Sequence, residues 1–178
     1  MRWFVPALCT AAVVGVLCHG LNSKTCRGAR GQQYIVRATT PCNHTTLLDL
    51  MYRCQLVVLN GHGPCIRRIR KRWDGMIHEL VDGGNAPAVT HDKTTIRICL
   101  DDNPSINALM FVVLHELAHV GCHTVGHTDE FWDGFASLLE AARRIGVYNV
   151  HDPMERVCGT EIGPGPSSGG SSGDFQTK

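Results

Sequence analysis

The sequence lacks an excess of charge of either sign. Its 178 residues carry 17 Lys and Arg against 16 Asp and Glu, which gives a formal net charge of +1. Nucleic-acid-binding domains and acidic tails show a clear imbalance of charge, so bulk electrostatics predicts neither of them here. Any basic surface for a partner must therefore be local.

The chain also lacks paired C-x-x-C spacing, although it contains nine cysteines. A structural zinc knuckle requires such pairs, so this class of site is not expected. Seven cysteines follow the N-terminal apolar segment, and their number fits two or three disulfides with a free thiol, or reduced thiols in a cytosolic protein. They are Cys26, Cys42, Cys54, Cys65, Cys99, Cys122 and Cys158.

The N-terminal apolar run is shorter than the roughly 20 residues that a spanning helix usually needs. It extends from Trp3 to Cys18 without a charged side chain, and no clear A-x-A-like cleavage site follows it. We interpret residues 1–20 as a signal peptide or a membrane anchor. The sequence thus predicts a membrane-anchored or secreted protein, with the body on the cytosolic face if the segment is retained.

The remaining sequence has the length and patterning of one domain. Residues 21–32 are polar and rich in Gly and Arg, which favours a linker. The tail 163–178 is rich in Gly, Ser and Pro and is predicted to be disordered. We therefore assign the folded domain to residues 33–162.

Apolar spacing predicts several elements in this domain. Helices are expected from Thr45 to about Leu59, from Ile66 through Leu80, and from Thr128 to Gly146. The helix from Ile66 carries a basic run, Arg67 to Arg72, which we interpret as its solvated face, with a nucleic-acid patch as the alternative. Short strands are expected over residues 33–38 and 94–100, and residues 148–158 are expected to be irregular.

Residues 109–120 are apolar almost all round, which predicts a helix buried in the core. The sequence His115-Glu116-Leu117-Ala118-His119 lies in this segment. Two histidines four residues apart share a helix face and can reach one zinc ion, while Glu116 is turned toward the open position of the metal. Zinc lowers the pKa of its bound water to about 7, so Glu116 is the candidate general base. The alternative is a pair of core histidines with satisfied hydrogen bonds.

A catalytic zinc site needs a third protein ligand. His123 lies too far along the helix axis from His115 to share the ion, so we expect it to be exposed or to lie beside the ligands. His127, directly after Gly126, is the best placed candidate, and Glu130 and Glu140 are its rivals. A metzincin site is excluded because Cys122 and Val125 occupy the positions that require Gly and His.

The segment HELAHVGCHTVGHTDEFW resembles the H-E-x-x-H and G-H-x-x-x-F arrangement of SprT-like and WLM-type zinc peptidases. This resemblance implies His115, His119 and His127 as zinc ligands and Glu116 as the base. Over roughly residues 94–163 the chain also resembles metallopeptidases inferred in large nucleocytoplasmic DNA viruses, through INALMFVVLHELAH, GHTDEFW, IGVYNVHDP and Cys158-Gly159. The resemblance implies an α+β minimal-zincin fold, mostly helical with a short sheet, in a viral protein of the virion or a host endomembrane.

These observations together predict a Zn²⁺-dependent peptidase that acts on a protein or peptide substrate, with a membrane partner if residues 1–20 are retained and no nucleic-acid partner. One alternative is a zinc-stabilised binding or virion structural protein without catalysis. The other is a DNA–protein crosslink protease, as the cellular relatives of these groups imply. Tyr148 is expected to pack in the core, with hydrogen bonding to a tetrahedral intermediate as its alternative role.

Overall fold

The computed structural model of the chain describes residues 23–27, 33–37, 43–80, 86–100, 104–152 and 155–162. The chain divides into two compact units, residues 1–45 and 46–178. In the first unit, β1 (Ser23–Arg27) and β2 (Gln33–Arg37) form an antiparallel pair. The predicted strand at residue 33 is confirmed, whereas β1 lies inside the segment that we interpreted as a linker.

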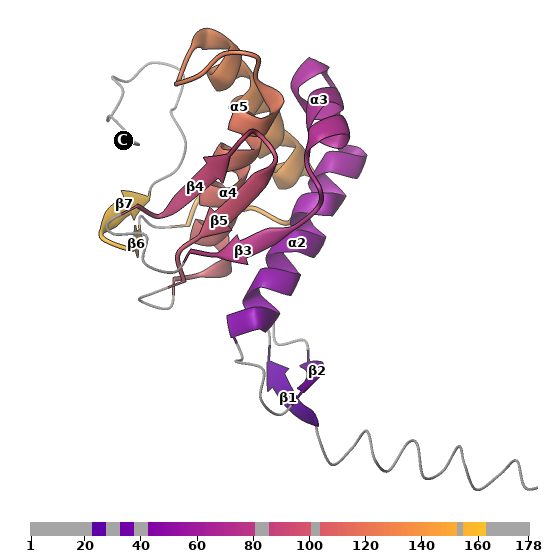
Figure 1. Ribbon diagram of the computed structural model, residues 1–178, viewed down its shortest axis with the longest axis vertical. Coiled ribbons are helices and arrows are strands. Elements are labelled where there is room, and N and C mark those ends of the chain that lie inside the picture. The colour runs from indigo at the N-terminus through magenta and orange to yellow at the C-terminus, as the bar shows by residue number, and fades with distance from the viewer. Residues whose placement is uncertain are drawn as a thin grey trace, which may run out of the picture. The chain divides into compact units, whose positions relative to one another are not determined.

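The larger unit is built around helix α4 (Ile106–Gly121), which is buried along almost its whole length. Ser105 caps this helix, because its hydroxyl accepts a hydrogen bond of 3.1 Å from the backbone N–H of Ala108. The helix packs against α3 (Pro64–Arg72) and α5 (Asp129–Arg144) and also against the strands (Figure 1). The prediction of a buried central helix is confirmed.

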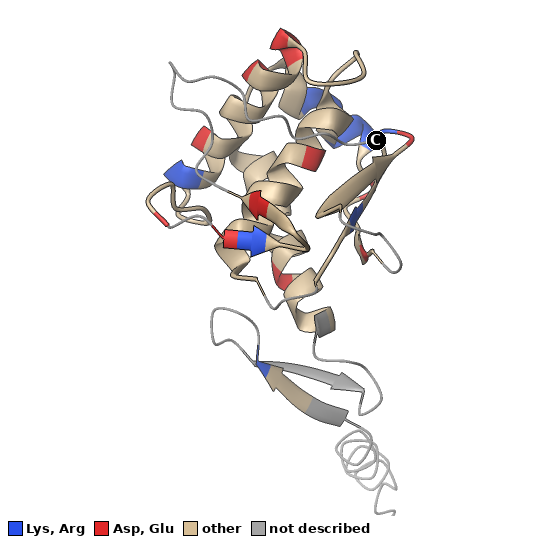
Figure 2. Cartoon of the chain, turned by 90° about the vertical axis from the view of Figure 1, so that its left-hand side faces the viewer, with Lys and Arg blue, Asp and Glu red and all other residues tan. Residues whose placement is uncertain are grey.

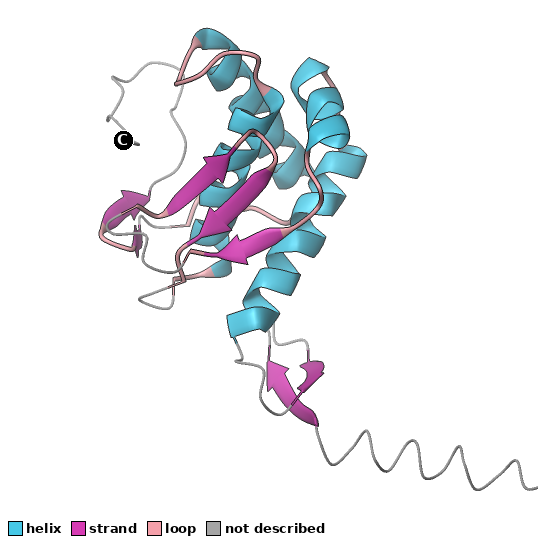
Figure 3. Cartoon of the chain, viewed as in Figure 1, coloured by secondary structure: helices cyan, strands magenta, loops and turns pink. Residues whose placement is uncertain are grey.

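A three-stranded sheet covers α4, as the strands in front of the helices in Figure 3 show. Its order is β3 (Ile77–Glu79), β5 (Thr95–Ile98) and β4 (Ala88–His91), so β4 is an edge strand. The β3 strand runs parallel to β5, and β4 runs antiparallel to it. The predicted strand at residues 94–100 is therefore confirmed, while β4 was missed.

The helix predicted from Ile66 through Leu80 ends early, at Arg72. The reason is a turn in which the Asp74 carboxylate accepts a 2.8 Å hydrogen bond from the Met76 N–H and Gly75 adopts a φ of 84°. The chain then enters β3. The apolar spacing of Met76, Ile77 and Leu80 continued the helical pattern only by coincidence.

The helix α2 (Asn43–Asn60) confirms the first predicted helix, and α5 confirms the last. Beyond α5, β6 (Glu155–Val157) and β7 (Thr160–Ile162) form an antiparallel hairpin in a region that was expected to be irregular. A disulfide joins Cys99, after β5, to Cys158 in the hairpin turn. Cys54, Cys65 and Cys122 are buried free thiols, so the cysteines follow neither of the two patterns that we considered.

The described chain is thus an α+β fold of four helices and small sheets, as predicted. The predicted membrane-anchored or secreted state is wrong. In the described ranges, no helix is long and apolar enough to cross a membrane. Residues 1–20, on which that prediction rested, and the tail 163–178 lie outside the described residues.

Candidate metal centre

Two histidines of the centre lie on successive turns of α4. His115 and His119 have ring centroids 5.0 Å apart, as the four-residue spacing requires. The His115 side chain is buried, with 4% of its surface exposed. The four-residue spacing therefore places both imidazoles on one face of the central helix.

The third histidine comes from the loop between α4 and α5. Gly126 has a φ of 83°, which only glycine adopts readily, and this turn directs the chain back toward α4 at His127. The Nε2 atom of His127 lies 3.0 Å from Nε2 of His115. One ring nitrogen from each of His115, His119 and His127 lies within 4.8 Å of the other two, so these three side chains form a group that could hold a metal ion.

The rival ligands lie elsewhere. Glu130 binds Arg68, with 2.6 Å between Oε1 and Nη2, and also accepts hydrogen bonds from the loop backbone. Glu140 is exposed and pairs with Arg143 at 2.9 Å. His123 is exposed on the loop, as expected. The structure therefore brings His127, and none of these three residues, to the histidine pair.

Aromatic rings enclose the three imidazoles. The Phe131 centroid lies 4.8 Å from that of His115 and 4.4 Å from that of His119, and Trp132 lies 5.5 Å from His127. Burial and the neighbouring histidines lower the pKa of His115 to about 3, and burial lowers the pKa of His119 to about 4. Both rings are therefore neutral at pH 7, which leaves nitrogen lone pairs available for a metal.

Glu116 is the buried carboxyl group beside this cluster. Burial raises its pKa from 4.5 to about 7, while a hydrogen bond from Thr90 acts in the opposite direction. The Thr90 hydroxyl lies 2.5 Å from Oε2 of Glu116. The edge strand β4 thus supplies a direct contact to the carboxylate, and no sequence pattern had singled out Thr90.

A cavity of about 450 Å³ opens at the carboxylate. Its walls are β4, the turn after it, the face of α4 and the loop before His127. The lining residues are Val89, Thr90, Asp92, Lys93, Glu116, His119, Thr124, Val125 and Gly126. A substrate in this cavity would contact Glu116 and His119 together.

Tyr148 does not line this cavity. It is buried, with 6% of its surface exposed, and its ring packs against Phe111 at a centroid distance of 6.3 Å. Phe111 in turn contacts Phe135 edge to face at 5.2 Å. The packing interpretation of Tyr148 is therefore confirmed.

The basic run on α3 is not simply a solvated face. Arg70 binds the carbonyl oxygens of Val58, Leu59 and Gly61, at the end of α2, with distances of 2.9–3.0 Å. Arg68 and Arg72 bind carbonyls at the end of α4. In the view of Figure 2, acidic and basic residues are interspersed over the described elements.

Comparison with known proteins identifies viral relatives. Uncharacterized protein 136R of invertebrate iridescent virus 6 is 39% identical over 147 residues, which are 69% of this chain and 79% of that protein. Uncharacterized protein 042R of invertebrate iridescent virus 3 is 45% identical over 70 residues, 36% of this chain and 44% of that protein. Uncharacterized protein R325 of Acanthamoeba polyphaga mimivirus is 30% identical over 128 residues, 66% of this chain and 64% of that protein.

The chain therefore spans less than two thirds of the length of the second and third relatives. No family model matches the chain. No solved structure matches it either.

Proposed function

We propose that this chain, which belongs to the family of viral proteins that includes 136R of invertebrate iridescent virus 6, is a zinc-dependent peptidase with a zincin-like site. The observation that supports the proposal most directly is the arrangement of three histidines and one glutamate beside the cavity. Three histidine nitrogens converge within 4.8 Å, and the buried carboxylate of Glu116 lies on the same helix at the cavity. This is the donor set and the base that metal-assisted hydrolysis requires.

The donor set fits zinc. Three neutral imidazoles are borderline-soft nitrogen ligands, and a site with three protein ligands keeps a fourth position open. Zinc held by His115, His119 and His127 would supply an acidified water and a Lewis acid for a substrate carbonyl. The Nε2 atoms of His115 and His127 are already 3.0 Å apart, close to the separation of two ligands on one tetrahedral ion.

Glu116 is suited to accept the proton of the attacking water. Its carboxyl group is buried, which raises its pKa to about 7 in the metal-free protein. The charge of a bound zinc ion would favour the carboxylate, which is the form that a general base needs at neutral pH. Thr90 occupies Oε2, so Oε1 is the oxygen that takes a proton from water and returns it to the leaving amine. The hydroxyl of Thr90 also orients the carboxylate toward the cavity.

The outer edge of β4, which pairs with no other strand among the described residues, favours a peptide as the substrate. The Cys99 N–H donates to the Pro87 carbonyl at 2.9 Å, and Thr90 is in register with Ile96. Because hydrogen-bonded and non-hydrogen-bonded pairs alternate in an antiparallel ladder, the N–H and C=O of Thr90 and Ala88 point away from β5. An extended peptide can pair with these groups as an added strand, which would lay its carbonyls along the cavity.

The test compares the full chain with Glu116→Gln and Glu140→Gln. We expect the parent to contain zinc and to cleave members of a broad peptide library, and Glu116→Gln to keep the zinc but lose turnover. Removal of a general base typically costs about 10²- to 10⁴-fold in rate. Glu140→Gln is the matched control, because Glu140 is exposed and its carboxylate pairs with Arg143 at the surface, and it should behave like the parent.

The same experiment addresses the alternative of a zinc-stabilised binding or virion structural protein. A structural site has no need of a carboxylate at an open position. Equal zinc content in parent and Glu116→Gln, with no turnover by the parent across the library, would favour that alternative and contradict the proposal.

A further inference from the structure

Lys93 lies in the tight turn between β4 and β5 and has an unusual backbone conformation. Its φ is 55° and that of Asp92 is 50°, so two successive residues without glycine adopt left-handed geometry. Positive φ at both central residues is the geometry of a tight turn between antiparallel strands, closed here by the 3.0 Å hydrogen bond from the Thr94 N–H to the His91 carbonyl. The turn explains the backbone of Lys93, and its side-chain contacts need a separate explanation.

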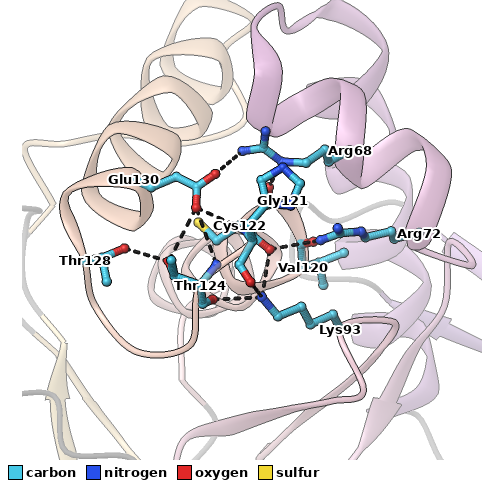
Figure 4. Close-up of polar contacts among 10 residues, drawn as sticks. Arg68, Arg72, Lys93, Val120, Gly121, Cys122, Thr124, Thr128 and Glu130 are labelled. Carbon is cyan, nitrogen blue, oxygen red and sulfur yellow. Dashed lines mark hydrogen bonds and ion pairs between the residues drawn. The ribbon is translucent and has the colours of Figure 1, made fainter.

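The ammonium group of Lys93 binds the backbone that leaves α4. Its Nζ atom lies 2.8 Å from each of three consecutive carbonyl oxygens, those of Cys122, His123 and Thr124. A lysine has three N–H donors, so this contact set uses all of them. Figure 4 shows the side chain of Lys93 pointing at this backbone segment. Lys93 is thus not free to bind substrate, although it lines the cavity.

Arg72 binds carbonyls at the end of α4, whereas Lys93 also binds carbonyls of the loop that follows it. Arg72 binds the carbonyls of Val120 and Cys122 at 3.1 and 2.9 Å, which are the last groups of the helix and its cap. Lys93 extends this pattern to His123 and Thr124, beyond the helix. Only Val125 and Gly126 separate Thr124 from the ligand His127.

Glu130 holds the same loop through its N–H groups. Its Oε2 atom accepts hydrogen bonds from the backbone N–H of His123 at 3.0 Å and of Thr124 at 3.4 Å. These bonds lower the pKa of Glu130 below its usual range. In Figure 4, Glu130 and Lys93 approach the loop from opposite directions, so both the amides and the carbonyls of this short segment are fixed.

We propose that Lys93 is a positioning residue for the metal centre, which fixes loop 122–128 so that His127 is presented to His115 and His119. The inference rests on the proposed function, because it assigns a role at the same zinc site. A helix-capping role alone would explain the contact with Cys122. It would not explain the contacts with the carbonyls of His123 and Thr124, which lie between the end of the helix and the proposed ligand.

The test measures Zn²⁺ affinity of the full chain by competition with a chelating indicator, for the parent and Lys93→Met. Methionine keeps the length and apolar stem of the side chain and removes the three donors. We expect the dissociation constant for Zn²⁺ to rise by about 10- to 100-fold, the usual effect of removing a group that orients a ligand. With Co²⁺ in place of Zn²⁺, the visible absorption bands of the variant should change, since the loss of His127 alters the coordination.

Arg70→Met is the matched control. Arg70 also donates to three carbonyls, but at the end of α2, away from the loop. Both variants should lower the melting temperature of the metal-free protein, and only Lys93→Met should weaken Zn²⁺ binding. If Lys93→Met binds Zn²⁺ as tightly as the parent, or if Arg70→Met weakens binding equally, the positioning role is overturned.

A second variant, Lys93→Gln, serves as the test if Lys93→Met does not fold. Lys93→Gln keeps N–H donors but loses the charge, and it should show a smaller loss of Zn²⁺ affinity. Unchanged affinity in a folded Lys93→Gln would overturn the inference. A parent protein that binds no Zn²⁺ would overturn the proposed function and this inference together, whereas unchanged binding in the Lys93 variants overturns this inference alone.

Discussion

The hydroxyl of Thr90 lies 2.5 Å from Oε2 of Glu116, so the edge strand of the sheet donates a hydrogen bond to the proposed general base. Burial raises the pKa of this carboxyl to about 7, and the Thr90 bond limits the rise. Two residues 26 positions apart in the chain thus set the protonation of the site together.

Replacing Thr90 by Val should shift the pH dependence of catalysis. Without the hydrogen bond the carboxylate is less stabilised, so the pKa of Glu116 rises. The acidic limb of the plot of kcat/KM against pH then shifts to higher pH. A hydrogen bond to a charged group contributes about 1.5 kcal/mol, which corresponds to about one pH unit. Thr90→Ser keeps the hydroxyl and should retain the parent profile; a Thr90→Val profile that matches it would contradict this role.

The third ligand is tested by two alanine variants of one loop. His127→Ala should weaken Zn²⁺ binding strongly, because it removes one of the three nitrogen donors. His123→Ala should leave the affinity unchanged, since the exposed side chain of His123 is outside the cluster. Equilibrium dialysis against Zn²⁺ measures both affinities. Weaker binding by His123→Ala than by His127→Ala would show that the proposed ligand set is wrong.

The metal-free protein should lose stability in acid because of its buried histidines. The pKa of His115 falls from 6.5 in the unfolded chain to about 3 in the folded one, so between these values only the unfolded chain takes up this proton. Stability from this group is fully present above pH 6.5 and declines as the pH falls through this window.

The slope of the unfolding free energy against pH reports how many protons the chain takes up on unfolding. His115→Leu should therefore reduce this slope by an amount that corresponds to at most about one proton. Urea unfolding in the presence of a chelator measures this slope. Glu116 has the opposite effect between pH 4.5 and about 7, but it is present in both proteins and cancels in the comparison. Equal slopes in parent and variant would show that His115 is not held neutral.

Close packing at Gly134 provides a test of the fold around the site. A Cβ at this position would lie 2.8 Å from Sγ of Cys65, so Gly134→Ala should destabilise the protein by about 1–3 kcal/mol. Removing the sulfur in Gly134→Ala/Cys65→Ala should recover part of the loss, with a coupling of about 1 kcal/mol. Chemical denaturation of the four proteins measures the coupling, and strict additivity would argue against this contact.

Local patterns predicted the parts of the protein that local physics determines. The apolar segment 109–120 could only be a buried helix, and His115, Glu116 and His119 follow from their spacing on it. His127 could be proposed because Gly126 allows the chain to turn back. The end of α3 at Arg72 was missed because the apolar pattern continued through Met76, while the Asp74-Gly75 turn decided the structure.

Contacts between distant residues could not be predicted in this way. Thr90 lies in a strand of four residues, too short to give a pattern, and its contact with Glu116 depends on how the sheet packs on α4. The Lys93 contact with Thr124 joins residues 31 positions apart. The arginines of α3 were interpreted as a solvated face because an apolar stripe marks the buried side of the helix, yet they bind the ends of α2 and α4, which the pattern of one helix cannot show.

X-ray absorption at the zinc edge of the zinc-loaded full chain tests the central claim most directly. Coordination by His115, His119 and His127 predicts a first shell of nitrogen and oxygen at about 2.0–2.1 Å, with outer scattering from three imidazole rings and no sulfur. A zinc–sulfur shell at about 2.3 Å would place the metal on thiols such as Cys65 or Cys122 and would contradict the account.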